Sequence, residues 1–175
     1  MNNEVWKEIE GYDNYMVSNF GNIKNIKRNQ MLNPQASGYL TVCLYDNNNK
    51  QKTMTIHKLV AEAFCENPNK YKMVDHINGS RQDNHSQNLR WCNSSQNAMN
   101  RGKTTRATSS KYKGVSLRSE HPYRPWRVHI FNNGKRIYLG AFATEREAGQ
   151  RYNKEAHRLF GDFAKLNDIS ESDSE

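Results

Sequence analysis

Residues 1–55 carry their apolar side chains in short clusters separated by Asn and Gly, which restricts this segment to small strands and tight turns. In GYLTVCLYDNNNK, the residues from Tyr39 to Tyr45 alternate between two sets, as side chains do between the two faces of a strand, and DNNNK reads as a hairpin tip. Only 35% of the 175 residues are hydrophobic, which disfavours a single large core. The sequence therefore predicts an α+β protein of small modules, beginning with a small antiparallel β module over residues 1–55.

In the middle of the chain, the spacing of the apolar residues changes from that of a strand to that of a helix. HKLVAEAFCENP has its apolar residues at helical spacing and ends at Pro68. The strand-like KMVDHI follows, then a polar loop, a second strand near LRWC, and a short helix that Asn93, Ser94 or Ser95 can cap. The predicted order is strand, polar loop, strand, helix. The three cysteines are far apart and form no CxxC pair, so neither a disulfide framework nor a cysteine-based zinc site is indicated.

Three strands are predicted near the C-terminus: KGVSLR, WRVHIF and RIYLGAF, with an NNG hairpin tip between the last two. A helix follows, opened by the capping box Thr144–Glu147. If this helix covers the face that carries Trp126, the opposite face presents Arg, His, Tyr and Phe side chains to solvent. Such a face is typical of a docking surface.

Charge is unevenly distributed along the chain. The net charge is +8, and residues 101–167 hold 15 basic against 5 acidic residues. A basic block of this strength predicts a polyanionic partner. Residues 101–111 are predicted to be a basic linker that lies on phosphates through Arg101, Lys103 and Arg106. The acidic tail, residues 168–175, is predicted to be disordered. No apolar run approaches membrane-spanning length, so an intracellular protein that does not contact membranes is expected.

The stretch VDHINGSRQDNHSQNLRWCN allows two interpretations: a solvated loop between two strands, or a metal site that cuts phosphodiesters. Cutting requires a base to activate water and a divalent metal to stabilise the developing charge. Asp75 suits a hard cation such as Mg²⁺, and His76 titrates near neutral pH. The amide of Asn97 could supply a second ligand, and that of Asn88 could hold the loop or orient His76.

Residues 74–100 resemble the HNH endonuclease motif, which opens with Asp-His, has Asn-Leu in the middle and closes with Asn. WKEIEGYDNYMVSNFGNIKNI resembles the NUMOD4 module of homing nucleases, and IHKLVAEAF is similar to their connecting helix. The resemblance implies a ββα-metal (His-Me finger) nuclease unit over residues 56–100, with Asp75 and Asn97 as metal ligands, His76 as general base and Asn88 positioning it. The products would be a 5′-phosphate and a 3′-hydroxyl. Many relatives have His in place of Asn97, and an oxygen ligand favours Mg²⁺ or Mn²⁺ over zinc.

Residues 112–167 resemble the AP2 DNA-binding domain, through YKGV, the strand W-x-V-x-I, YLGAF, the helix TEREAGQRYNKEA and GDFAKLN. The resemblance implies a three-stranded sheet that enters the major groove of double-stranded DNA. Arg118 and Arg136 are expected to read bases more than Lys113, which is expected to hold phosphate. The full set of contacts expected on this face is Lys113, Arg118, Arg127, His129, Phe131, Arg136 and Tyr138.

Together these patterns predict a site-specific DNA endonuclease of the HNH homing type. The first alternative is a catalytically inactive DNA-binding regulator, in which the central motif survives as scaffold. The second is a nuclease that acts on RNA. No dimerisation signal is evident, which slightly favours a monomer, and the resemblance implies the cytoplasm of a bacterial host if the protein is phage-encoded.

Overall fold

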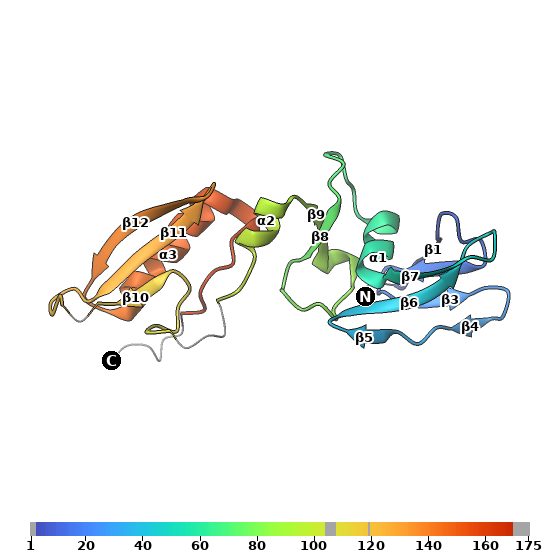
Figure 1. Cartoon of the computed structure of the whole chain (residues 1–175), viewed down its shortest axis with the longest axis horizontal. Coiled ribbons are helices and arrows are strands. Elements are labelled where there is room, and N and C mark those ends of the chain that lie inside the picture. Colours follow the sequence, from blue (N-terminus) through green and yellow to red (C-terminus); the bar gives the residue numbers. More distant parts are fainter. Residues whose placement is uncertain (1–2, 104–107, 119, 170–175) are drawn as a thin grey trace. The chain divides into compact units, whose positions relative to one another are not determined.

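The computed structural model describes residues 3–103, 108–118 and 120–169. The chain divides into two compact units between Ser94 and Ser95 (Figure 1). Each unit combines small antiparallel sheets with helices, so the predicted α+β class is confirmed. None of the helices in these described ranges is long and apolar enough to cross a bilayer.

Two antiparallel sheets open unit 1. The first runs in the order β1 (Trp6–Glu8), β2 (Tyr15–Ser18), β3 (Ile23–Asn25) and β4 (Gln30–Met31). The second contains β5 (Gln35–Ser37), β6 (Tyr39–Tyr45) and β7 (Gln51–Thr55). The strand predicted over Tyr39–Tyr45 is confirmed, and the amide of Asp46 donates to the carbonyl of Lys50 across the predicted hairpin tip.

Helix α1 (Ile56–Phe64) connects these sheets to a two-stranded hairpin made of β8 (Met73–His76) and β9 (Leu89–Cys92). A 3₁₀ turn, η1 (Ser86–Asn88), precedes β9. The helix packs against β2, β6, β7 and β9, and its buried face joins one core with side chains from both halves of the unit. The N-terminal module and the Asp-His hairpin therefore share a single core, because neither has enough apolar residues to enclose one alone.

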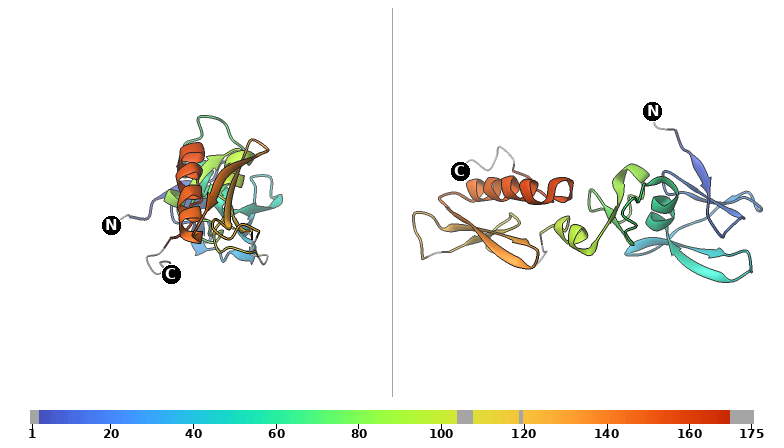
Figure 2. Two further views of the ribbon diagram at one scale, coloured as in Figure 1. Left: turned by 90° about the vertical axis from the view of Figure 1, so that its left-hand side faces the viewer. Right: turned by 90° about the horizontal axis from the view of Figure 1, so that it is seen from above.

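Unit 2 starts within α2 (Ser94–Met99) and continues with a three-stranded antiparallel sheet, β10 (Val115–Leu117), β11 (Trp126–Asn132) and β12 (Lys135–Phe142). Helix α3 (Glu145–Phe160) lies across one face of this sheet (Figure 2). The 3₁₀ turn η2 (Gly161–Phe163) follows the helix. Both hydrogen bonds of the predicted Thr144–Glu147 capping box are present. The core between sheet and helix contains Val128 and Ile130, as the alternation predicted, so the residues between them lie on the face opposite α3.

Candidate active site and nucleic-acid interface

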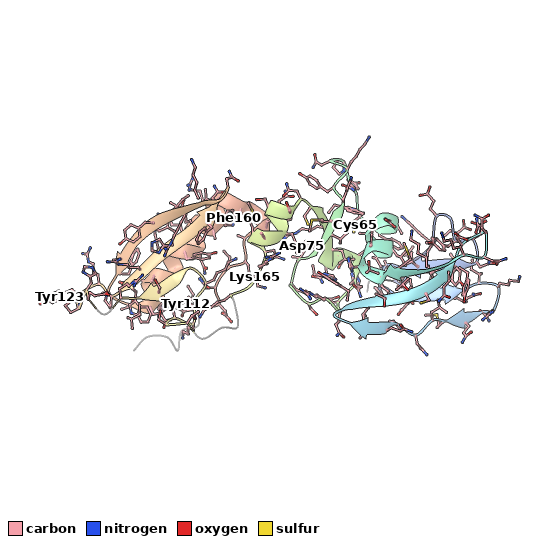
Figure 3. All side chains as sticks on the ribbon, viewed as in Figure 1. Cys65, Asp75, Tyr112, Tyr123, Phe160 and Lys165 are labelled. Atoms are coloured by element: carbon pink, nitrogen blue, oxygen red, sulfur yellow. The ribbon has the colours of Figure 1, made fainter. Side chains whose placement is uncertain are left out.

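Asp75 lies on β8 directly opposite Arg90 on β9, and the two form a buried ion pair (Figure 3 labels Asp75). Nε and Nη2 of Arg90 both donate to Oδ2 of Asp75, at 3.0 and 2.8 Å. The carboxylate is 6% exposed. A guanidinium that donates twice to one carboxylate fixes its orientation. The sequence did not reveal Arg90, because only the strand register places it across from Asp75.

His76 follows on the same strand and is 5% exposed. Its Nε2 lies 3.1 Å from Oδ1 of Asn84, which is itself 4% exposed. The amide nitrogen of Asn84 donates to the carbonyl of Gln82 at 3.5 Å, which directs Oδ1 toward the imidazole. An amide oxygen can only accept, so Nε2 carries the proton and Nδ1 has the lone pair of the neutral ring. This arrangement suits His76 to accept a proton through Nδ1.

Aromatic rings surround His76. The ring of His57 meets it edge-on with centroids 5.2 Å apart, and the ring of Tyr39 stacks at 5.9 Å. The guanidinium of Arg81 lies 4.8 Å from the centroid of Tyr39. Burial, and to a lesser extent the charges of His76 and Lys58, lower the pKa of His57 to about 4. His57 is therefore neutral at pH 7 and packs against the ring of His76.

Asn88, predicted to hold the loop or to orient His76, makes its hydrogen bonds to the loop. Its Oδ1 accepts from the amide of Asn78 at 3.0 Å, and its Nδ2 donates to the carbonyl of Asp83 at 2.8 Å. Asn84, which no sequence pattern singles out, has its Oδ1 within hydrogen-bond distance of the His76 ring. Nothing in the local pattern distinguishes one asparagine of this polar stretch from another, so only the fold identifies Asn84.

Asn97, the predicted second metal ligand, is a half-buried residue of α2 and belongs to unit 2. Its role as a ligand stays a prediction. The chemistry of the donor set fits the expected ion, because one carboxylate and one carboxamide both offer the oxygen atoms that hard divalent cations prefer.

The face of the unit 2 sheet opposite α3 is cationic and aromatic. Nη2 of Arg136 lies 3.2 Å from Nδ1 of His129, and the rings of His129 and Tyr138 have centroids 5.2 Å apart. Burial, and then the charges of Arg136, Arg127 and Arg118, lower the pKa of His129. Phe131 and Tyr138 are 65% and 55% exposed. Cationic and aromatic groups that share an open sheet face can contact both phosphates and base edges.

Lys113, which is predicted to contact DNA, makes hydrogen bonds within unit 2, and its contact with DNA stays a prediction. Its Nζ donates to the carbonyls of Met99 and Arg101, at 2.9 and 2.6 Å. Burial, together with the charge of Lys165, lowers the pKa of Lys113 to about 8. The ammonium of Lys113 thus connects the end of α2 and the start of the linker to the segment that leads into β10. Lys103 is half-buried, and Arg106 lies outside the described residues, as does most of the acidic tail.

Two family models match the chain. The NUMOD4 motif matches residues 4–45, and the HNH endonuclease model matches residues 55–99.

Named relatives are similar to about half of the chain. An uncharacterized HNH endonuclease, L247 of Acanthamoeba polyphaga mimivirus, is 44% identical over 99 residues, which cover 54% of this chain and 25% of the relative. The DNA endonuclease I-HmuI of Bacillus phage SP01 is 40% identical over 103 residues, which cover 55% of this chain and 59% of I-HmuI. A solved structure titled "DNA binding and cleavage by the HNH homing endonuclease I-HmuI" aligns with a TM-score of 0.51 and 39% identity, over 55% of this chain and 56% of the other. The chain thus spans well under two thirds of these relatives.

A plant protein is also similar to about a third of the chain. The dehydration-responsive element-binding protein 2D of Arabidopsis thaliana is 41% identical over 61 residues, which cover 34% of this chain and 28% of the relative. The AP2-like ethylene-responsive transcription factor TOE2 of the same plant is 37% identical over 65 residues, which cover 35% of this chain and 12% of the relative.

Proposed function

We propose that this chain is an HNH homing endonuclease that hydrolyses phosphodiesters of double-stranded DNA at a specific site. The observation that carries the proposal is the buried imidazole of His76, held through Nε2 by Asn84 and placed next to the carboxylate of Asp75 on β8. A ring held in this way can act as a general base, because its orientation and its proton-accepting atom are both defined.

In the proposed reaction, Nδ1 of His76 takes a proton from the attacking water. Asn84 keeps the ring oriented, and the rings of His57 and Tyr39 limit the access of bulk water around it. Asp75 and Asn97 would hold Mg²⁺ or Mn²⁺, which supplies positive charge to the phosphate and to the departing oxygen when bound. The 3′ oxygen leaves, so the products are a 5′-phosphate and a 3′-hydroxyl.

Recognition is proposed to reside in unit 2, as a reader of the AP2 type. Its sheet is covered by α3 on one face, and the other face carries the cationic and aromatic side chains that can enter the major groove. Linker residues Arg101, Lys103 and Arg106 are proposed to lie along phosphates. The proposed contacts of the sheet face are Arg118, Arg127, His129, Phe131, Arg136 and Tyr138.

The test is cleavage of a supercoiled plasmid library with random inserts in Mg²⁺, comparing the wild type with His76→Ala. The wild type should cut at a limited set of sites and leave 5′-phosphates, whereas His76→Ala should bind DNA and not cut. Labelled RNA serves as a competitor. Tighter binding and faster cutting of RNA than of duplex DNA would refute the proposed substrate.

A catalytically inactive regulator is the second candidate, and the Asp75–Arg90 ion pair is the observation that favours it. A guanidinium bound twice to the proposed metal ligand competes with a cation for the same carboxylate. Isothermal titration with Mn²⁺ separates the two candidates. Heat from a site that Asp75→Asn abolishes supports the nuclease, and the same weak heat in both proteins supports the regulator.

A further inference from the structure

The turn between β2 and β3, residues 18–22, is organised by its own hydrogen bonds. Ser18 is fully buried, and its Oγ accepts from the amides of Phe20 and Asn22 at 3.2 and 3.0 Å. The amide of Gly21 donates to the carbonyl of Ser18 at 3.0 Å. Gly21 has a φ of +88°, a conformation that glycine adopts without steric cost. The shape of this turn is therefore set within the N-terminal module itself.

Three contacts connect this turn to the loop that follows His76. The carbonyl of Asn19 accepts from the amide of Ser86 at 2.8 Å. The rings of Phe20 and His85 lie with their centroids 4.8 Å apart. At Gly21, the position that a Cβ would occupy is 2.9 Å from Cβ of Asn84. The turn thus backs the loop at three successive residues, and the closest approach is at Asn84.

Asn84 is the side chain that holds the ring of His76. It is 4% exposed, its Oδ1 lies 3.1 Å from Nε2 of the imidazole, and its Nδ2 donates to the carbonyl of Gln82. A buried amide packed between a rigid turn and an imidazole has little freedom to rotate.

We propose that the N-terminal module has a second role in this protein: through Gly21 and Asn84 it positions the ring of His76 and fixes the proton on Nε2. Asn84 is thus a positioning residue. The inference rests on the proposed function, in which His76 is the general base. The N-terminal module is then part of the support of the catalytic loop.

The glycines of the N-terminal module provide a matched pair of variants. Gly11 and Gly21 have φ of +77° and +88°, so alanine strains the backbone similarly at both positions. At Gly11 no atom lies within 4 Å of the added Cβ, whereas at Gly21 it meets Asn84. We expect Gly21→Ala to lower the single-turnover cleavage rate at saturating protein by about 10-fold or more, since a small displacement of a reacting group can cost about 100-fold. Gly11→Ala should retain the wild-type rate.

A second measurement reads the ring directly, without DNA. In ¹⁵N NMR spectra of the full chain, the wild-type His76 ring should be the Nε2-protonated tautomer. Asn84→Leu removes the acceptor and should give a mixture of both tautomers and slower cleavage. Asn84→Asp restores an acceptor oxygen and should recover the Nε2-protonated form.

The outcomes separate the two proposals. The positioning role is refuted if folded Gly21→Ala and Asn84→Leu proteins keep both the wild-type tautomer of His76 and the wild-type cleavage rate. If His76→Ala cuts as fast as the wild type, the proposed function fails, while the tautomer of His76 in the Asn84 variants still decides whether Asn84 positions this ring.

Discussion

His76 in unit 1 and His129 in unit 2 are both hydrogen-bonded through one ring nitrogen, but with opposite polarity. Oδ1 of Asn84 can only accept, so His76 donates from Nε2 and keeps a lone pair on Nδ1. The guanidinium of Arg136 can only donate, so His129 accepts at Nδ1 and keeps its proton on Nε2. One ring is thereby prepared to take a proton, and the other to donate a hydrogen bond.

The two rings also differ in how far they are exposed to solvent. His76 is 5% exposed among other rings, whereas His129 lies on an open sheet face beside exposed Phe131 and Tyr138. Chemistry requires a single orientation, which buried contacts provide. Recognition requires that the side chains reach the partner, which burial would prevent. If catalysis belongs to unit 1 and recognition to unit 2, substitutions in the two units should have different effects.

The largest effect is expected from removing the base. His76→Ala should lower the single-turnover cleavage rate at saturating protein by about 10²- to 10⁴-fold, the usual contribution of a general base. Its affinity for DNA, measured by gel shift, should stay close to wild type. His129→Ala should instead weaken binding. Equal losses of single-turnover rate in both variants would contradict the assignment of catalysis to His76 and of binding to His129.

Next is the buried ion pair of unit 1. Arg90→Met removes two charge-assisted hydrogen bonds from the buried carboxylate of Asp75 and should lower the free energy of unfolding by about 3 kcal/mol. Urea denaturation without divalent metal measures this. Lys58→Met is the control, because the exposed Lys58–Glu62 pair should contribute less than about 0.5 kcal/mol. Similar losses of unfolding free energy in both variants would show that the buried Asp75–Arg90 pair contributes no more than the exposed pair.

A smaller effect is expected on the open face of unit 2. Arg136→Ala should cost about 1–3 kcal/mol of binding free energy and relax the preference at a specific base pair. Lys135→Ala, at the exposed hairpin tip beside it, should weaken binding to all sequences alike. Selection from a randomised duplex library, with affinities at two salt concentrations, measures both. A uniform loss for Arg136→Ala would show that this residue holds phosphate only.

The smallest effect concerns the pH dependence of stability. The pKa of His57 is about 4 in the folded chain against an ordinary value of 6.5, so between these values the unfolded chain binds more protons. The free energy of unfolding should therefore fall as the pH drops from 6.5 to 4, by about 1–2 kcal/mol after allowing for the partial exposure of this ring. His57→Phe should remove this dependence in urea melts at pH 7 and 4.5. An unchanged slope would contradict the prediction.

The elements predicted from local signals were found in the structure, including the strand Tyr39–Tyr45 and the capping box of α3. Alternation, turn residues and caps act within a few residues, so they can be read from the chain directly. The modules predicted over residues 1–55 and 56–100 share one core to which α1 contributes its buried face, and no local signal in the sequence indicates this packing.

The order of Asp75, His76 and Asn88 within a strand-loop-strand pattern determined the resemblance to HNH endonucleases, because spacing along a chain is preserved whatever the fold does with it. Tertiary structure alone decided which groups meet: Arg90 pairs with Asp75, Asn84 holds His76, and Lys113 turns inward to carbonyls. These contacts depend on strand register and on the packing of segments far apart in sequence, and such long-range geometry has no local signature.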